Sequence, residues 1–206
     1  MIARWNVAAV IWAAFALGGC GAKPVSTLLH PDAALVRVRS NATEGKPAEE
    51  GLGFFASPDG IVVTCARVVH GAQAVTVVAP DGSTLAARVL QEDADAGVAI
   101  LKVAGKNLPS LALFDGDIAP GMHVRMLGEG GIVHGVFDQW ENFGRDVDFT
   151  ARVGPGDCGA PLLADDGKVM GIVLGHFEGR PTSSRAAPVW RVLQMMPNLR
   201  TPQPAS

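Results

Sequence analysis

Short apolar segments separated by turn residues recur along most of this chain, and this pattern limits the fold more than any other feature. Residues 74–79 and 84–90 flank Pro80-Asp81-Gly82, and two further apolar segments flank Asp165-Asp166-Gly167. Proline presets φ for a turn and glycine accepts a positive φ, so both sites are typical of β-hairpins. Many short strands joined by such turns predict an all-β barrel or sandwich.

The β pattern covers nearly all of the chain beyond residue 33. The predicted strands are residues 34–39, 53–56, 61–64, 74–79, 84–90, 98–103, 122–127, 132–137, 147–153, 162–163 and 169–174. Only residues 189–196, which follow Pro188, have a helical pattern. We therefore expect an all-β domain with a short C-terminal helix.

Charge and residue types exclude several classes of function. The net charge of −3 and the pI near 5.9 leave no basic face for phosphates, so we expect no nucleic-acid partner. His123, His134 and His176 are scattered over predicted strands, and no CxxC or HxxxH spacing occurs. We therefore expect no metal site and no cofactor.

The first twenty residues have the features of a secretory signal. Arg4 supplies a positive charge, and the apolar run 7–17 is too short to span a bilayer as a helix. The run ends in residues 17–20 (LGGC), which resemble a bacterial lipobox. That resemblance implies cleavage before Cys20 by signal peptidase II and a lipid anchor on the Cys20 thiol. The alternative is an ordinary secretory signal with a chance cysteine.

These features predict how the chain is organised. Residues 1–19 form a signal peptide, 20–32 a tether, 33–197 the folded domain and 198–206 a flexible tail. Gly21 follows the cysteine in place of the aspartate of an inner-membrane retention signal. We expect a lipid-anchored protein of the bacterial cell envelope, on the outer membrane rather than the inner one, with its domain in the periplasm.

Three separated segments of the predicted domain resemble one protease family. Residues 51–69 are similar to that family's GSGF and TxxHVV segments, residues 95–103 to its TDVALLKI strand, and residues 154–172 to its NPGNSGGPLL segment and the hairpin after it. In this order they resemble the HtrA/Deg group of trypsin-like proteases over residues 34–197. The resemblance implies a trypsin-like double β-barrel with the active site between the barrels. No PDZ domain is recognisable after it.

The resemblance also locates the three catalytic positions, and all three are altered. Cys158 lies where the family has its nucleophilic serine, Arg67 where it has histidine, and Gly97 where it has aspartate. A thiol can act as a nucleophile, but arginine cannot accept a proton at physiological pH and glycine has no side chain to orient a base. The sequence therefore predicts a catalytically inactive pseudoprotease.

Other parts of the family's site have counterparts here. Gly156, Asp157 and Cys158 lie at the oxyanion turn, whose N–H groups are expected to hold a carboxylate or carbonyl oxygen. Arg152 lies at the position similar to the floor of the specificity pocket, where it would favour acidic groups. The alternative is that Arg152 pairs with Asp157 or points to solvent.

One histidine near the lost position is a candidate replacement base. His70 lies three residues after Arg67, and one tight helical turn would bring both to the same face. Asp93 and Asp95 are close to the lost aspartate position. A general base must lie within about 3 Å of its proton donor, however, and one helical turn is about 5 Å. We therefore expect His70 on a surface turn.

The remaining cysteines form a potential pair. If Cys20 carries lipid, Cys65 and Cys158 are left, and their segments face each other across the site in the resembling fold. We expect a Cys65–Cys158 disulfide. The alternatives are a free Cys158 whose thiol pKa is lowered by Arg67, or two reduced cysteines that only pack.

Three functions follow from these observations. The first is a membrane-tethered pseudoprotease that binds or scaffolds a peptide or protein of unknown identity. The second is a peptidase with Cys158 as nucleophile and an unusual base, and the third is a thiol redox sensor. Arg67 and Gly97 favour the first over the second, and a monomer is the default state.

Overall fold

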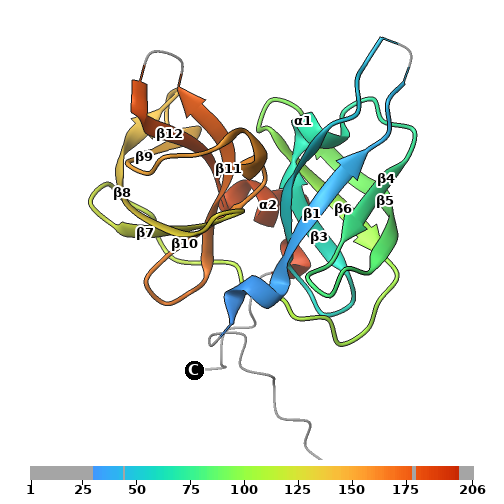
Figure 1. The fold of residues 1–206 in the computed structure, drawn as a ribbon. Coiled ribbons are helices and arrows are strands. Elements are labelled where there is room, and N and C mark those ends of the chain that lie inside the picture. The colour runs from blue at the N-terminus through green and yellow to red at the C-terminus, as the bar shows by residue number, and fades with distance from the viewer. Residues whose placement is uncertain (1–29, 44, 178–179, 200–206) are drawn as a thin grey trace, which may run out of the picture.

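Two closed antiparallel barrels of six strands each form the body of the molecule (Figure 1). The computed structural model describes residues 30–43, 45–177 and 180–199. The strand order is β1-β2-β3-β6-β5-β4 in the first barrel and β10-β11-β12-β9-β8-β7 in the second. This arrangement confirms the predicted all-β, trypsin-like double barrel. The predicted lipidation site, Cys20, lies outside the described residues.

The elements follow one another in a simple order. The first barrel contains β1 (Leu35–Ser40), β2 (Glu50–Phe55), β3 (Ile61–Cys65), β4 (Val75–Val78), β5 (Thr84–Asp93) and β6 (Val98–Val103). The second contains β7 (His123–Gly128), β8 (Gly131–Glu141), β9 (Asp146–Phe149), β10 (Pro161–Leu163), β11 (Val169–Phe177) and β12 (Arg180–Pro188). The helices are η2 (Pro31–Ala34), α1 (Ala66–Val69), η3 (Pro155–Asp157), α2 (Trp190–Met195) and η4 (Pro197–Leu199). Within the described residues, no helix has the length and apolar character needed to cross a membrane.

Both hairpins predicted from turn residues are present. Residues 80–82 join β4 to β5, and the turn is closed by a hydrogen bond from the Ala79 N–H to the Ser83 carbonyl. Residues 165–167 lie between β10 and β11, and the Ala164 N–H donates to the Lys168 carbonyl. Turn chemistry was thus sufficient to locate strand pairs.

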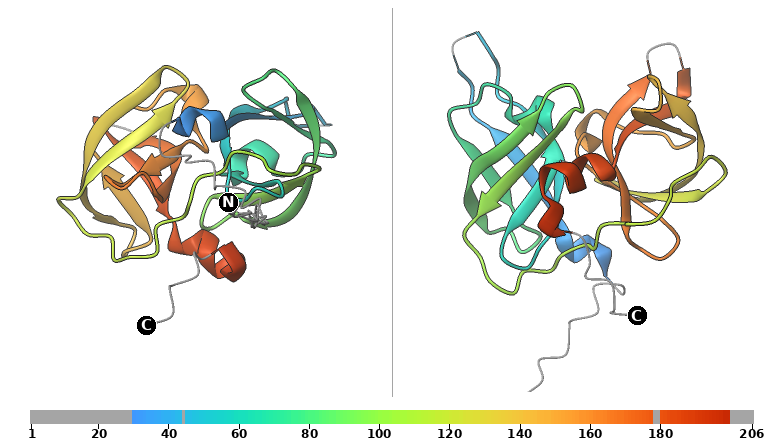
Figure 2. Two further views of the ribbon diagram at one scale, coloured as in Figure 1. Left: turned by 90° about the horizontal axis from the view of Figure 1, so that it is seen from below. Right: turned by 180° about the vertical axis from the view of Figure 1, so that it is seen from behind.

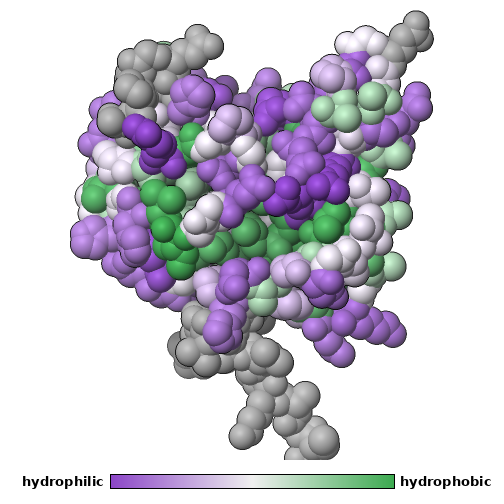
Figure 3. Space-filling view, in the orientation of Figure 1, coloured by the Kyte–Doolittle hydropathy of each residue, from purple (hydrophilic) through white to green (hydrophobic). Residues whose placement is uncertain are grey.

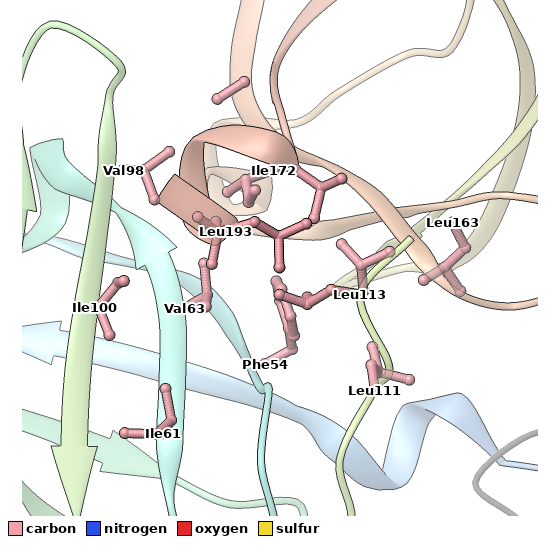
Figure 4. Close-up of a cluster of buried hydrophobic side chains, with 14 of the residues drawn as sticks. Phe54, Ile61, Val63, Val98, Ile100, Leu111, Leu113, Leu163, Ile172 and Leu193 are labelled. Carbon is pink, nitrogen blue, oxygen red and sulfur yellow. The ribbon is translucent and has the colours of Figure 1, made fainter. Parts of the chain in front are cut away.

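Apolar side chains form three buried clusters. One fills the first barrel and another fills the second. The third, which we call the interface cluster, lies between the barrels and includes Phe54, Val63 and Ile172 (Figure 4). Because β3 contacts one cluster on each face, all five of its residues are buried, and four of them are apolar.

The C-terminal helix and the inter-barrel linker hold the two barrels together. Helix α2 places Val192 and Leu193 in the interface cluster, and Figure 2 shows it beside both barrels. In the linker, the Leu111 N–H donates to Phe55 of the first barrel and the Phe114 N–H to Val169 of the second. On the face seen in Figure 1, apolar side chains gather in the middle with hydrophilic ones around them (Figure 3).

The structure differs from the predicted elements at several places. Strand β12 was not predicted, because its segment (RPTSSRAAP) has no alternating apolar pattern; its ladders with β9 and β11 determine its structure. Strand β8 is longer than the predicted 132–137, and β9 ends at Phe149 rather than at residue 153.

A surface ion-pair network on β1 and β2 makes stability depend on pH. Glu50 lies 2.7 Å from Arg39 Nε and 2.9 Å from Arg37 Nη1. The hydrogen bond from Arg39, and after it the one from Arg37, lowers the pKa of Glu50. Since the folded-state pKa is depressed, this stabilisation is present above the unfolded-state pKa of about 4.3 and is lost as the pH falls through the folded-state value.

We expect Glu50→Gln to lower the free energy of unfolding at pH 7 by less than about 1 kcal/mol, because the pair is exposed. The difference from wild type should be smaller at pH 3, below the unfolded-state pKa, than at pH 7. Urea denaturation at both pH values measures it, with the exposed Asp117→Asn as the matched control. An equal difference at pH 7 and pH 3 would contradict the assignment.

Candidate functional site

A cleft of about 360 Å³ lies between the barrels and contains the three positions that the resemblance assigns to the family's catalytic residues. Residues of both barrels line it, and Cys65, Arg67, Gly97 and Cys158 are among them. The remaining lining residues are Lys46, Glu49, Ala66, His70, Glu92, Ala94, Leu174 and Arg185. The fold therefore brings together segments that are up to 139 residues apart in sequence (from Lys46 to Arg185).

A disulfide bond joins Cys65 to Cys158 across the cleft. Cys65 ends β3 in the first barrel, and Cys158 follows η3 in the second, with their Cα atoms 6.0 Å apart. Both residues are buried. The disulfide expected from the resemblance is present, and in this state the thiol at the nucleophile position is consumed.

Backbone contacts hold Cys158 in place independently of its sulfur. The Leu52 N–H donates to the Cys158 carbonyl at 2.8 Å, and the Gly159 N–H donates to the Val173 carbonyl at 2.7 Å. Gly159 has a φ of +94°, and a Cβ there would lie 2.0 Å from the Leu52 carbonyl oxygen. Only glycine fits this close approach of the two barrels.

Arg67, which the sequence resemblance assigns to the family's histidine position, forms an ion pair with Glu49. It lies on α1, the single helical turn after β3, and its Nη1 donates to Glu49 Oε2. About half of the Arg67 side chain is exposed, whereas Glu49 is 25% exposed. The guanidinium is therefore held at the rim of the cleft, where it can donate hydrogen bonds but cannot accept a proton.

Gly97, which the sequence resemblance assigns to the family's aspartate position, has a backbone that disfavours any side chain. Its φ is +71°, a left-handed value. A Cβ on Gly97 would lie 2.9 Å from Leu174 Cδ2, so the Leu174 side chain occupies the adjoining space. The Gly97 carbonyl accepts a hydrogen bond from the Ala66 N–H, which links this turn to α1. The position is thus a structural turn packed against leucine.

The turn similar to the oxyanion turn is organised by its aspartate. Asp157 is buried, and its carboxylate accepts hydrogen bonds from the N–H groups of Gly154 (2.7 Å) and Glu129 (2.9 Å). The Asp157 N–H itself donates to the Gly154 carbonyl within η3. A Cβ on Gly156 would lie 2.8 Å from Glu129 Oε2. The Asp157 N–H is therefore used inside the turn, and a carboxylate lies beside Gly156.

Arg152 is placed away from the predicted pocket. It is exposed in the segment between β9 and η3 and does not line the cleft. It does not pair with Asp157 either, because the Asp157 carboxylate is bonded to backbone N–H groups. The structure thus agrees with the alternative that Arg152 points to solvent.

His70 is paired with an acid that the sequence did not single out. Its Nδ1 lies 2.6 Å from Glu92 Oε1 at the end of β5, and 69% of its side chain is exposed. Asp93 instead accepts a hydrogen bond from the Ala96 N–H, and Asp95 is exposed on the same turn. A single helical turn, α1, is present at Ala66–Val69 and ends just before His70, and His70 and Cys158 line one cleft.

Several lining residues were missed because they lie outside the family-like motifs. Lys46 donates from its Nζ to the backbone carbonyls of Arg67 (3.3 Å) and His70, at the end of α1. Glu49 and Arg185 contribute charges to the rim, and Leu174 contributes an apolar wall. Glu49 lies two residues before the family-like segment that begins at Gly51. This proximity was the one sequence signal that could have pointed to Glu49. Among the described residues, no group of three His, Cys, Asp or Glu side chains could hold a metal ion.

Comparisons with known proteins agree with this geometry. Residues 51–172 match the family model described as a trypsin-like peptidase domain. A probable periplasmic serine endoprotease DegP-like from Halomonas elongata is 37% identical over 134 residues, which cover 59% of this chain and 28% of that protein. The putative serine protease HhoB from Synechocystis is 33% identical over 144 residues, which cover 61% of this chain and 35% of that protein. The chain thus spans about a third of the length of these relatives.

A solved structure shows the same fold. The serine endoprotease from Yersinia pestis superposes with a TM-score of 0.70 at 22% identity, covering 82% of this chain and 63% of that one. The family model covers more than half of this chain, from β2 in the first barrel to β11 in the second. By its sequence match and its double barrel, the chain belongs to the trypsin-like peptidase domain family.

Proposed function

We propose that this protein is a pseudoprotease of the cell envelope, which binds extended polypeptide segments in its inter-barrel cleft without cleaving them. One observation carries the proposal: the Cys65–Cys158 disulfide occupies the nucleophile position in the cleft. The two other catalytic positions, Arg67 and Gly97, line that cleft as well.

Chemistry supports the loss of proteolysis. Acyl transfer needs a nucleophile, a base that accepts its proton and a group that orients the base. A disulfide sulfur is no thiolate, Arg67 is engaged with Glu49, and the Gly97 turn is packed against Leu174. Each position is occupied by a contact that stabilises the fold, so the inactive arrangement has its own structural basis.

The cleft nevertheless keeps features that suit a peptide. Strand β11 pairs with β10 only as far as Ile172, so among the described residues its other edge has no strand partner at Gly175 and His176, which follow the cleft-lining Leu174. Free N–H and C=O groups on a strand edge can pair with an added extended segment. The cleft volume of about 360 Å³ is within the range of small ligand sites and accommodates side chains of such a segment.

The proposed location follows from the relatives and from the cysteines. The Halomonas relative is named a periplasmic endoprotease, and disulfides persist in the oxidising periplasm. The lipobox-like LGGC at residues 17–20 implies an anchor on Cys20, with the outer membrane favoured because Gly21 follows. We therefore place the domain in the periplasm, tethered to a membrane.

Binding of fluorescein-labelled β-casein, an unstructured polypeptide, tests this function in the full chain without reductant. We expect saturable binding by fluorescence anisotropy and intact casein after overnight incubation. Ala94→Trp should weaken the binding at least tenfold, because Ala94 is exposed and lines the cleft. The matched control is Ala86→Trp, an exposed alanine on β5 that does not line the cleft.

Two outcomes would contradict the proposal. Cleavage of casein that is lost in Cys158→Ala would show that the protein is a peptidase. Absence of binding, or equal weakening by Ala94→Trp and Ala86→Trp, would remove the cleft as a polypeptide site.

A further inference from the structure

The cleft contains a histidine–carboxylate pair outside the family's catalytic positions. His70 ends α1 and Glu92 lies in β5, with His70 Nδ1 and Glu92 Oε1 2.6 Å apart. A carboxylate on one ring nitrogen orients the imidazole and leaves the other nitrogen available to accept a proton. The pair therefore has the chemistry of an oriented general base.

The same cleft holds the only two cysteines of the described residues. Cys65, Cys158, His70 and Glu92 all line it. His70 is 69% exposed, so its side chain has room to change rotamer, whereas Glu92 is 24% exposed and more restricted. A nucleophile precursor, a base and an orienting acid thus share one cavity, although none of the three family positions supplies the base or the acid.

Reduction of the disulfide would leave Cys158 in this cavity. Its carbonyl is bonded to the Leu52 N–H and the next residue's N–H to the Val173 carbonyl, so the backbone is held by contacts that do not need the sulfur. The Sγ of Cys158 also lies 3.4 Å from the Leu174 carbonyl. The freed thiol would therefore stay in the cleft that His70 and Glu92 also line.

Other charges face this site from each neighbouring segment. Lys46 and Glu49 come from the segment between β1 and β2, Arg67 from α1, and Arg185 from β12. Arg67 is offset by Glu49, and Arg185 Nη1 lies 3.8 Å from Asp146. The Lys46 ammonium is bonded to backbone carbonyls. Among the described residues, Arg67 and Arg185 each have a carboxylate partner and Lys46 has none. None of these three cations can accept a proton, whereas the neutral form of His70 can.

We propose that reduction of the Cys65–Cys158 bond converts the cleft into a thiol nucleophile site, with His70 as the base for Cys158 and Glu92 as the residue that positions His70. An external dithiol transfers two electrons and two protons to the cysteines and becomes a disulfide. His70 then takes the Cys158 proton, and the thiolate forms a bond to an electrophilic carbon of a small molecule while the leaving group on that carbon departs with its bonding electrons. This inference concerns the reduced protein and does not depend on polypeptide binding by the oxidised one.

Alkylation by iodoacetamide tests the proposal without knowledge of a natural substrate. The Cys158 thiolate forms a C–S bond and iodide leaves. In full-length Cys65→Ala, mass spectrometry of the peptide that contains Cys158 gives its alkylation rate from pH 5 to 10, so Cys20 does not interfere. Dithiol-reduced wild type, measured in the same way, serves as a second form if the variant does not fold.

We expect the Cys158 rate to rise with an apparent pKa below 7, against about 8.5 for an ordinary thiol. At pH 6.5 His70→Ala should react about fivefold more slowly than the same protein with His70. The protein with His70 has a larger thiolate fraction, but its thiolate, of lower pKa, is intrinsically less nucleophilic, so the two effects partly cancel. Glu92→Gln should shift the apparent pKa of Cys158 alkylation part of the way toward 8.5. His134→Ala, an exposed histidine on β8, should leave it unchanged.

Two results would overturn the proposal. One is a profile near 8.5 that His70→Ala does not change in either reduced form. The other is a low apparent pKa that Arg67→Ala abolishes and His70→Ala preserves, which would assign the effect to the guanidinium. Circular dichroism of each variant separates these results from unfolding.

Discussion

Replacing both cysteines in Cys65→Ala/Cys158→Ala should lower the free energy of unfolding by about 4 kcal/mol. The disulfide closes a loop of 93 residues and joins the two barrels, so without it the unfolded chain gains a large amount of conformational entropy. Both residues are also buried, so their replacement removes packing contacts. Urea denaturation followed by circular dichroism measures the difference from oxidised wild type.

Reduced wild type is the appropriate control for this experiment. It keeps both sulfur atoms in the buried site and lacks only the covalent bond, so the loss it shares with the double variant belongs to the disulfide. Any further loss in the double variant belongs to packing. A stability of reduced wild type within about 1 kcal/mol of the oxidised protein would contradict the entropic account, since the chain-entropy estimate for this loop is several times larger.

Turn residues and family-like motifs predicted the parts of this fold that are local in sequence. The hairpin at residues 80–82 follows from turn chemistry alone, and the motif order implied two barrels. The cross-barrel disulfide followed from the resemblance, because the two cysteines lie in segments that face each other there. Each of these features depends on the sequence of one segment, or on which two segments face each other in the fold.

The features that could not be predicted depend on the register between strands. Glu92, rather than Asp93 or Asp95, reaches His70, and this choice depends on β5, whose pairing with β6 shifts register between Val89 and Gln91. A one-residue shift moves a side chain to the opposite face of a strand. Sequence proximity to the lost aspartate was therefore a poor guide to the acid partner.

The three positions that the resemblance assigns to the catalytic residues each contact a specific neighbour. The space beside Gly97 is taken by Leu174, and Arg67 has a partner in Glu49, which the sequence motifs do not include. Cys158 is bonded to Cys65, which follows Thr64 at the end of β3. Each substitution thus has a compensating neighbour, which predicts that reversal at the catalytic positions alone cannot restore the original site.

The chain that carries Cys65→Ala, Arg67→His, Gly97→Asp and Cys158→Ser should therefore remain without detectable hydrolysis of casein. An aspartate at position 97 must adopt a strained φ near +71° with its Cβ about 2.9 Å from Leu174 Cδ2, so the Leu174 side chain must move before the carboxylate can orient a histidine. Loss of the orienting carboxylate alone costs about 10⁴-fold in triad enzymes. Casein turnover, measured beside an active protease of the same fold, checks this expectation.

The stability of single variants shows whether this reason is correct. Gly97→Asp and Gly97→Ala should each lower the free energy of unfolding by about 1–3 kcal/mol, because both introduce a Cβ into the same left-handed turn. In a double-mutant cycle, Leu174→Ala should cost less in the Gly97→Asp chain than in wild type, since it also relieves the new contact. Additive effects would show that Leu174 does not block position 97. Casein hydrolysis by the chain with the restored triad would show that the turn tolerates a working carboxylate.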